Sequence, residues 1–160
     1  MFKKSMIAAA LALAALPVAA HHAGDQFRTG PMVVSHAWTE ETSPMAHAAE
    51  VFLTVENTGE AVDRLLSATT SFTAPGVFQA SVMTETGAVA VREVPAIEIA
   101  PGQSITFQPG GIHVVLNDVK RNLEAGDHFH MTLVFEEAGA LEIDVEIEEH
   151  GDHDHDAPAG

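Results

Sequence analysis

The chain has 160 residues, which is enough for one hydrophobic core. Its formal net charge of −16 at pH 7 argues against binding to nucleic acid or to an anionic membrane surface, and favours cations. It contains no cysteine, which excludes disulfides and thiolate metal sites, and its ten histidines make imidazole the main candidate metal ligand, beside thioether, carboxylate and a free amine.

Residues 1–20 are typical of a secretory signal peptide. An apolar run over 6–16 follows two lysines and is too short to span a bilayer. We expect cleavage after Ala20, because it leaves Val18 and Ala20 at the small-residue positions that the peptidase reads. The mature chain is then periplasmic, begins with His21, and has no later stretch long enough to insert into the membrane.

A histidine at the first position of a mature chain can chelate a metal through its α-amine and its imidazole. A second histidine then completes a T of three nitrogens, the histidine brace, which suits the tetragonal field that Cu(II) prefers. Zinc remains a second candidate, since it also accepts imidazole. The alternative is that 21–30 is a polar, extended arm that happens to begin with His21.

From Met32 onward the sequence predicts many short strands. Apolar, β-branched segments alternate with turn signals rich in Gly, Pro and Asn, and only 117–125 has a mildly helical composition. This pattern predicts an all-β sandwich or barrel. The first expected strand begins at Met32, and the others cover 50–56, 64–68, 77–83, 89–94, 97–100, 104–107, 112–116, 131–135 and 141–147.

Met45 and His47 follow Ser43-Pro44 in an expected loop. Positions two apart in an extended segment point the same way, so a thioether and an imidazole here could form half of a copper site. The alternative is a loop whose methionine packs on the core and whose histidine faces solvent.

Other histidines stand at strand ends. His36 lies near the end of the first strand and His113 begins a later one, and each is either a metal ligand or a hydrogen-bonded rim residue. His128 and His130 flank Phe129, so their side chains share a face and form either a separate, weaker site or an exposed edge.

Residues 149–160 alternate histidine with aspartate and contain nothing to bury. We expect a disordered tail that either collects metal ions loosely or is only a solvated acidic segment.

Seven short segments, in order, resemble the PCuAC (DUF461) family of periplasmic copper chaperones. The resemblance spans about 27 to 148 and implies a cupredoxin-like Greek-key β-sandwich over 21–148. It also implies a monomer that delivers copper to a periplasmic or membrane-anchored cuproenzyme, such as a cytochrome oxidase during its assembly. The segments are 27–30 (FRTG), 35–38 (SHAW), 52–59 (FLTVENTG), 63–65 (DRL), 99–102 (IAPG), 109–114 (PGGIHV) and 123–127 (LEAGD).

The family's Cu(I) ligands, two histidines and two methionines, fall at Ala80, Val91, His113 and Val115, of which only His113 can bind a metal. The chain is therefore similar to a variant branch, from methane-oxidising bacteria, that lacks this motif and uses a histidine brace. That resemblance implies a Cu(II) site of His21 with Met45, His47 and His113 at one end of the sandwich. The histidine that closes the brace is expected to be His47, then His113, then His36.

Three functions compete at this point. The first is a copper carrier that is not an enzyme. The second is a brace-dependent oxidative enzyme, which the single tryptophan and the absence of tyrosine make a poor match to an aromatic substrate face. The third is a metal-free adaptor that has kept the fold and lost the site.

Overall fold

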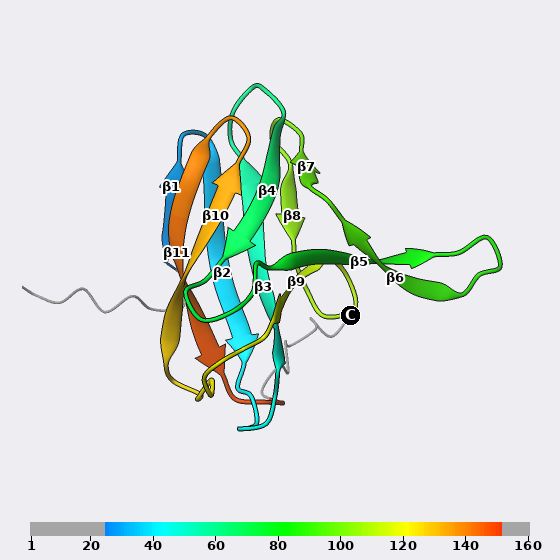
Figure 1. Ribbon diagram of the computed structural model, residues 1–160. Coiled ribbons are helices and arrows are strands. Elements are labelled where there is room, and N and C mark those ends of the chain that lie inside the picture. The colour runs from blue at the N-terminus through cyan, green and yellow to red at the C-terminus, as the bar shows by residue number, and fades with distance from the viewer. Residues whose placement is uncertain (1–24, 152–160) are drawn as a thin grey trace, which may run out of the picture.

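A computed structural model describes residues 25–151 (Figure 1). The predicted signal peptide, His21 and the part of the tail beyond residue 151 lie outside the described residues. Between residues 25 and 151 the chain forms strands, turns and loops, and it contains no helix that could cross a bilayer. The predicted all-β fold is therefore confirmed.

Eleven strands of the described chain form one mixed sheet. Neighbouring strands are antiparallel, except that β11 runs parallel to β2. The strands are β1 (Gln26–Thr29), β2 (Met32–Glu40), β3 (Ala48–Asn57), β4 (Asp63–Thr69), β5 (Val77–Met83), β6 (Val89–Val94), β7 (Ile97–Ile99), β8 (Ser104–Thr106), β9 (His113–Asn117), β10 (His128–Phe135) and β11 (Gly139–Glu148).

The sheet curls until it nearly closes into a barrel. Its order is β6-β5-β9-β3-β2-β11-β10-β4-β7, with β1 paired to β2 and β8 paired to β3. Strand β7 lies at one end of this order, and the short link 100–103 joins it to β8, which pairs with the central strand β3. The sheet must therefore curve so that β7 approaches β3. The β5–β6 hairpin extends away from the body (Figure 1).

Alternation along the strands places the core inside this curl. In β11 the inward residues Ile143, Val145 and Ile147 are buried, whereas Glu142 and its alternate successors point outward. Each fully buried aliphatic side chain contributes about 1.5–3 kcal/mol relative to exposure. The largest fully buried side chains include Phe107, Phe135, Met32, Leu53, Leu65 and Leu133.

Two segments differ from the sequence-based expectations. Residues 26–29, expected to be part of an extended arm, form β1, which pairs with β2 across the tight turn Gly30-Pro31. Residues 117–125 are not helical, because their backbone groups bond to other loops: Lys120 N–H donates to Phe72 O at 3.1 Å, and Leu123 O accepts from Thr42 N at 3.0 Å. Pairing with distant chain outweighs a weak local helical preference.

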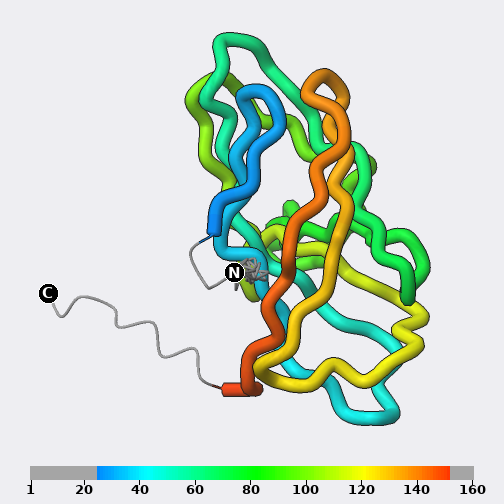
Figure 2. Tube along the Cα trace, turned by 90° about the vertical axis from the view of Figure 1, so that its left-hand side faces the viewer, coloured from blue at the N-terminus to red at the C-terminus, as the bar shows by residue number. Residues whose placement is uncertain are grey.

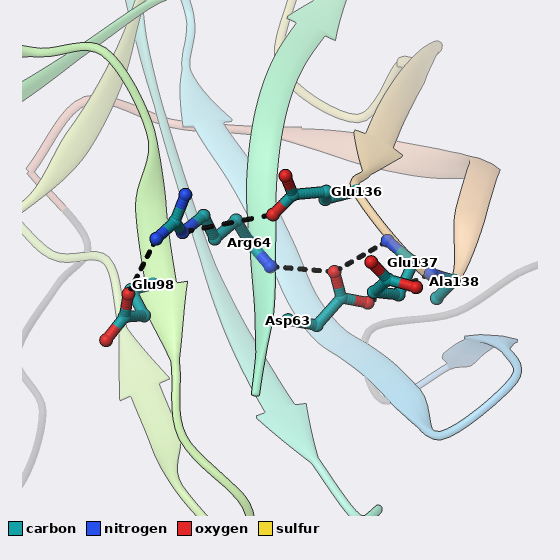
Figure 3. Close-up of polar contacts among 6 residues, drawn as sticks. All are labelled: Asp63, Arg64, Glu98, Glu136, Glu137 and Ala138. Atoms are coloured by element: carbon teal, nitrogen blue, oxygen red, sulfur yellow. Dashed lines mark hydrogen bonds and ion pairs between the residues drawn. The ribbon is translucent and has the colours of Figure 1, made fainter. Parts of the chain in front are cut away.

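A buried carboxylate joins β4 to the β10–β11 turn (Figure 3). Asp63 is 3% exposed, and its Oδ1 accepts the backbone N–H of Arg64 at 2.7 Å and that of Glu137 at 2.9 Å. Its Oδ2 accepts the N–H of Ala138 at 3.0 Å. The segment 63–65, one of those that resemble the PCuAC family, therefore contains a structural contact.

Candidate metal centre

Strand β2 changes its neighbour halfway along one edge. Over Met32–Ser35 that edge pairs with β1, and over Trp38–Glu40 it pairs with β11, while the other edge pairs with β3. Between the two halves the register with β3 shifts, so that His36 and Ala37 together oppose Leu53. This is a β-bulge, which bends the strand and lets it pair with a second partner.

His36 occupies the strained position of this bulge. Its φ is +51°, a left-handed conformation that non-glycine residues rarely adopt, and its side chain is exposed while Ala37 is buried. A residue held in this conformation often marks a functional site.

The described chain begins next to the bulge. Gln26 of β1 pairs with Ser35, so Asp25, which immediately precedes β1, lies beside His36. Residues 21–24 precede Asp25, and four extended residues span at most about 14 Å. Figure 2 shows this start of the chain midway along the molecule, far from the loop 41–47 at its lower end.

Outward carboxylates of β11 face the same region. Glu146 pairs with Trp38, and Asp144 and His36 each stand two residues before this pair on adjacent parallel strands. Alternation puts Asp144 and Glu146 on one outer face of the sheet. We call the region around His36, Trp38, Asp144 and Glu146 the junction.

His113 lies on the same outer face, two strands away from β2. Val114 pairs with Val51, so the next pair in the same register places His113 opposite Phe52. The ring of Phe52 in turn lies beside that of Trp38 on β2, with ring centroids 4.5 Å apart. The imidazole of His113 is buried, its Nδ1 lies 3.1 Å from Gly111 O, and its Nε2 lies 3.9 Å from Glu50 Oε1. With Nδ1–H donating to that carbonyl, Nε2 is the nitrogen left to accept a proton or a metal.

Met45 and His47 lie in the loop that precedes β3. Both are exposed, Met45 at 83%, and Val119 N–H donates to His47 O at 3.2 Å. His47 precedes Phe52, and so the level of His113, by five strand residues, a separation of about 16 Å. The described residues therefore do not bring Met45 and His47 alongside His113.

The metal-ligand assignment itself remains a prediction, because His21 lies outside the described residues. Among residues 25–151, no three His, Asp or Glu side chains are already arranged to hold an ion. The first described residues of the chain adjoin the junction, because Gln26 pairs with Ser35.

Sequence analysis missed Asp144, which accepts a hydrogen bond from His130 Nδ1 at 2.6 Å. The alternation of acidic and apolar residues in β11 was the available signal. The pairing of β10 with β11, which makes Asp144 the partner of His130, lay outside any local pattern.

The four positions that the resemblance to PCuAC implied for Cu(I) ligands, Ala80, Val91, His113 and Val115, lie on β5, β6 and β9. Gln79 pairs with His113 and Ser81 pairs with Val91, which puts Val91, His113 and Val115 on one face. Ala80 lies on the opposite face of β5. Among these four positions, His113 is the one that offers a metal-binding side chain.

Fold and site together define a small, strongly acidic β-sandwich domain of the PCuAC type, with an imidazole- and carboxylate-lined junction beside the first described residues. The chain belongs to the LpqE-like family, whose model is described as "Putative lipoprotein LpqE-like" and matches residues 32–147. This family is related to PCuAC, so the predicted fold is confirmed and the predicted family is confirmed in part.

Individual relatives agree with this assignment. The chain is 30% identical over 135 residues to "Putative lipoprotein Lxx21020" of Leifsonia xyli subsp. xyli, which covers 84% of this chain and 78% of the relative. The word lipoprotein is part of the printed descriptions of that relative and of the family model.

Solved structures of PCuAC domains are also similar. The copper-bound PCuAC domain from PmoF2 aligns with a TM-score of 0.68 at 26% identity, covering 78% of this chain and 98% of that domain. The apo PCuAC domain from PmoF1 aligns with a TM-score of 0.69 at 29% identity, covering 78% and 99%. The Cu(I) form of DR1885 from Deinococcus radiodurans, at 22% identity and a TM-score of 0.58 over 71% of this chain and 76% of that one, supports the fold alone.

Proposed function

We propose that this protein is an exported copper carrier that binds Cu(II) at the junction through the α-amine and imidazole of His21 and the imidazole of His36. The observation that carries the proposal is the pairing of Gln26 with Ser35, because it starts the amino-terminal arm beside an exposed histidine. The copper-bound PmoF2 domain, which shares the fold, supports copper as the metal.

The reach of the arm favours His36 over the other histidines. His36 lies next to Asp25, so a ligand from residues 21–24 could reach it without any strand moving. His47 instead lies in the loop that precedes β3, far from Asp25. His113 is less suited, because its ring is buried and its Nδ1 is engaged by Gly111 O. This reverses the order in which sequence alone ranked the three histidines.

The donors favour the cupric ion. Nitrogen and carboxylate ligands suit Cu(II), whereas Cu(I) prefers thioethers and thiolates. Met45 and Met83, the exposed methionines of the described chain, lie in the loop after β2 and at the end of β5, away from the junction. Zinc would compete for the same nitrogens.

A carrier fits the site better than an oxidative enzyme. Ligands supplied by a short arm and one exposed bulge residue would leave the ion open on one side, from which a partner could take it. We propose that the partner is a copper-requiring enzyme of the periplasm or its membrane, which fits the lipoprotein-like relatives and the predicted export.

The test is electron paramagnetic resonance of the processed protein with one equivalent of Cu(II), with affinity measured by competition. We expect a nitrogen-rich tetragonal spectrum, and loss of at least about tenfold in affinity for His36→Ala, because one of three nitrogens is removed. His47→Ala is the matched control and should stay within about twofold of wild type.

An added residue before His21 is the second arm of this test. It removes the chelating geometry of the α-amine without touching the folded domain and should abolish the tetragonal signal. Tight Cu(II) binding that survives this extension, or that survives His36→Ala and is lost in His47→Ala, would refute the assignment.

A further inference from the structure

His128 and His130 form a pair of imidazoles on the outer face of β10. They alternate with the buried Phe129, so both rings leave the sheet on the same side. The ring centroids are 6.0 Å apart and the ring planes are inclined at 82°. The amino-terminal arm is not needed to bring these two rings together.

Asp144 orients the ring of His130 through a hydrogen bond to Nδ1. Nδ1–H of His130 donates to Asp144 Oδ1 at 2.6 Å, and the carboxylate side chain is 10% exposed while the imidazole is 64% exposed. This bond fixes the tautomer in which Nε2 carries the free lone pair. A carboxylate that accepts the second N–H of a histidine is the usual outer partner of a metal-bound imidazole.

The spacing of the two rings fits one shared ion. Metal–nitrogen bonds of about 2.0–2.1 Å place the centres of two coordinating imidazoles about 5–6 Å apart at wide ligand angles. The two centroids already have this separation, so small side-chain rotations suffice. Glu146, the cross-strand partner of His128, adds negative potential next to the pair.

We propose that His128 and His130, oriented by Asp144, bind a divalent copper or zinc ion at a second site, which borders the junction and shares none of the nitrogen ligands proposed for the amino-terminal one. Two nitrogens come from the protein and the remaining positions are filled by water, consistent with the lack of any preformed three-ligand cluster between residues 25 and 151. Such a site is weak and exchangeable, which suits an ion in transit.

The experiment is a Zn²⁺ titration of the full-length mature chain, followed by NMR of the histidine side-chain nitrogens. The protein carries one extra residue before His21, so the amino-terminal chelate is disabled and the result does not depend on the proposed function. We expect the ring signals of His128 and His130 to shift together, with His130 bound through Nε2 and still protonated at Nδ1.

Two substitutions on β11 separate the outer carboxylate from general charge. Asp144→Asn should weaken Zn²⁺ binding at this pair by about 10–100-fold, the usual effect of losing an outer-shell partner. Glu142→Gln removes one charge from the same face of the same strand, where Glu142 pairs with Thr132, and should change affinity less than about threefold.

Two results would overturn the inference. One is that Zn²⁺ shifts only the histidines of the tail and leaves His128 and His130 unmoved. The other is that Asp144→Asn and Glu142→Gln have equal effects while the backbone amide spectrum shows both variants to be folded. In that case the face attracts cations only through its charge.

Discussion

His36 combines a strained backbone with an exposed imidazole. A left-handed conformation costs a non-glycine residue about 1–2 kcal/mol, and His36 has a φ of +51°. The bulge could accept a glycine there without strain. Histidine at position 36 therefore makes the fold less stable than glycine would, and the proposed copper site gives a functional reason for it.

At this scale we predict opposite effects on stability and on copper binding. His36→Gly relieves the strain and should leave the free energy of unfolding unchanged or raise it by up to about 1 kcal/mol. The same change removes the imidazole and should lower Cu(II) affinity at least about tenfold. Denaturant unfolding of the metal-free protein and Cu(II) competition measure the two quantities.

The matched control is His36→Ala, which removes the imidazole but keeps a side chain in the strained conformation. It should lose copper affinity as far as His36→Gly does and be less stable than that variant. Equal stabilities would show that the bulge carries no strain, and unchanged copper affinity in both would remove His36 from the site.

At the scale of elements, the junction results from the way β2 shares one edge between two partners. β1 occupies the edge up to Ser35 and β11 takes it over from Trp38. The first described residues, the bulge and the carboxylates of β11 meet there, because each partner strand ends or begins its pairing at that point.

Asp63 fixes the opposite end of β11, and we predict that Asp63→Asn destabilises the fold by about 2–3 kcal/mol. The buried carboxylate accepts hydrogen bonds from three backbone N–H groups. A hydrogen bond to a charged group contributes about 1.5–3 kcal/mol to the free energy of unfolding. In the variant, the side-chain NH₂ of asparagine replaces one of the two oxygens and cannot accept a hydrogen bond from the N–H group that it faces. Urea unfolding measures the loss.

Glu98→Gln is the control for this prediction (Figure 3). It removes the exposed ion pair of Arg64 and Glu98, whose atoms are 3.4 Å apart and whose side chains are 50% and 61% exposed. Exposed pairs contribute about 0–1 kcal/mol, so this variant should change stability by no more than about 0.5 kcal/mol. A loss in Glu98→Gln equal to that in Asp63→Asn would show that charge, not the buried contact, matters.

At the scale of the whole molecule, acidic residues dominate the surface, with a formal net charge of −16. On β11 alone, Glu142, Asp144, Glu146 and Glu148 stand at alternate positions of one strand. Like charges on one face repel one another and favour cations. This potential suits a protein that collects copper, and it lowers the stability of the metal-free form.

We predict that the melting temperature of the metal-free protein rises by a few degrees between about 10 mM and about 150 mM NaCl. The Debye length falls over this range from about 30 Å to about 8 Å, which screens the repulsion between carboxylates. Differential scanning calorimetry measures the shift. Replacing Glu142 and Glu148 with glutamine should reduce the salt effect, whereas a melting temperature that falls with salt would contradict it.

Much of the fold could be predicted from the sequence, because strand signals are local. Ten of the strands follow from alternation and turn residues, and Val77–Met83 and Val89–Val94 have the predicted bounds. The absence of cysteine and the abundance of histidine likewise restricted the metal ligands to nitrogen, oxygen and thioether donors. The polar strand β1 escaped because its pairing with β2, not its composition, makes it a strand.

Only the tertiary structure decided which histidine lies near the first described residues and which carboxylate each histidine faces. His36 and Asp144 meet the same junction because β11 pairs with β2, and His130 meets Asp144 because β10 pairs with β11. Residue types and periodicity are properties of a short stretch of chain. The register between strands far apart in sequence depends on how the whole core packs, and therefore no local pattern specifies it.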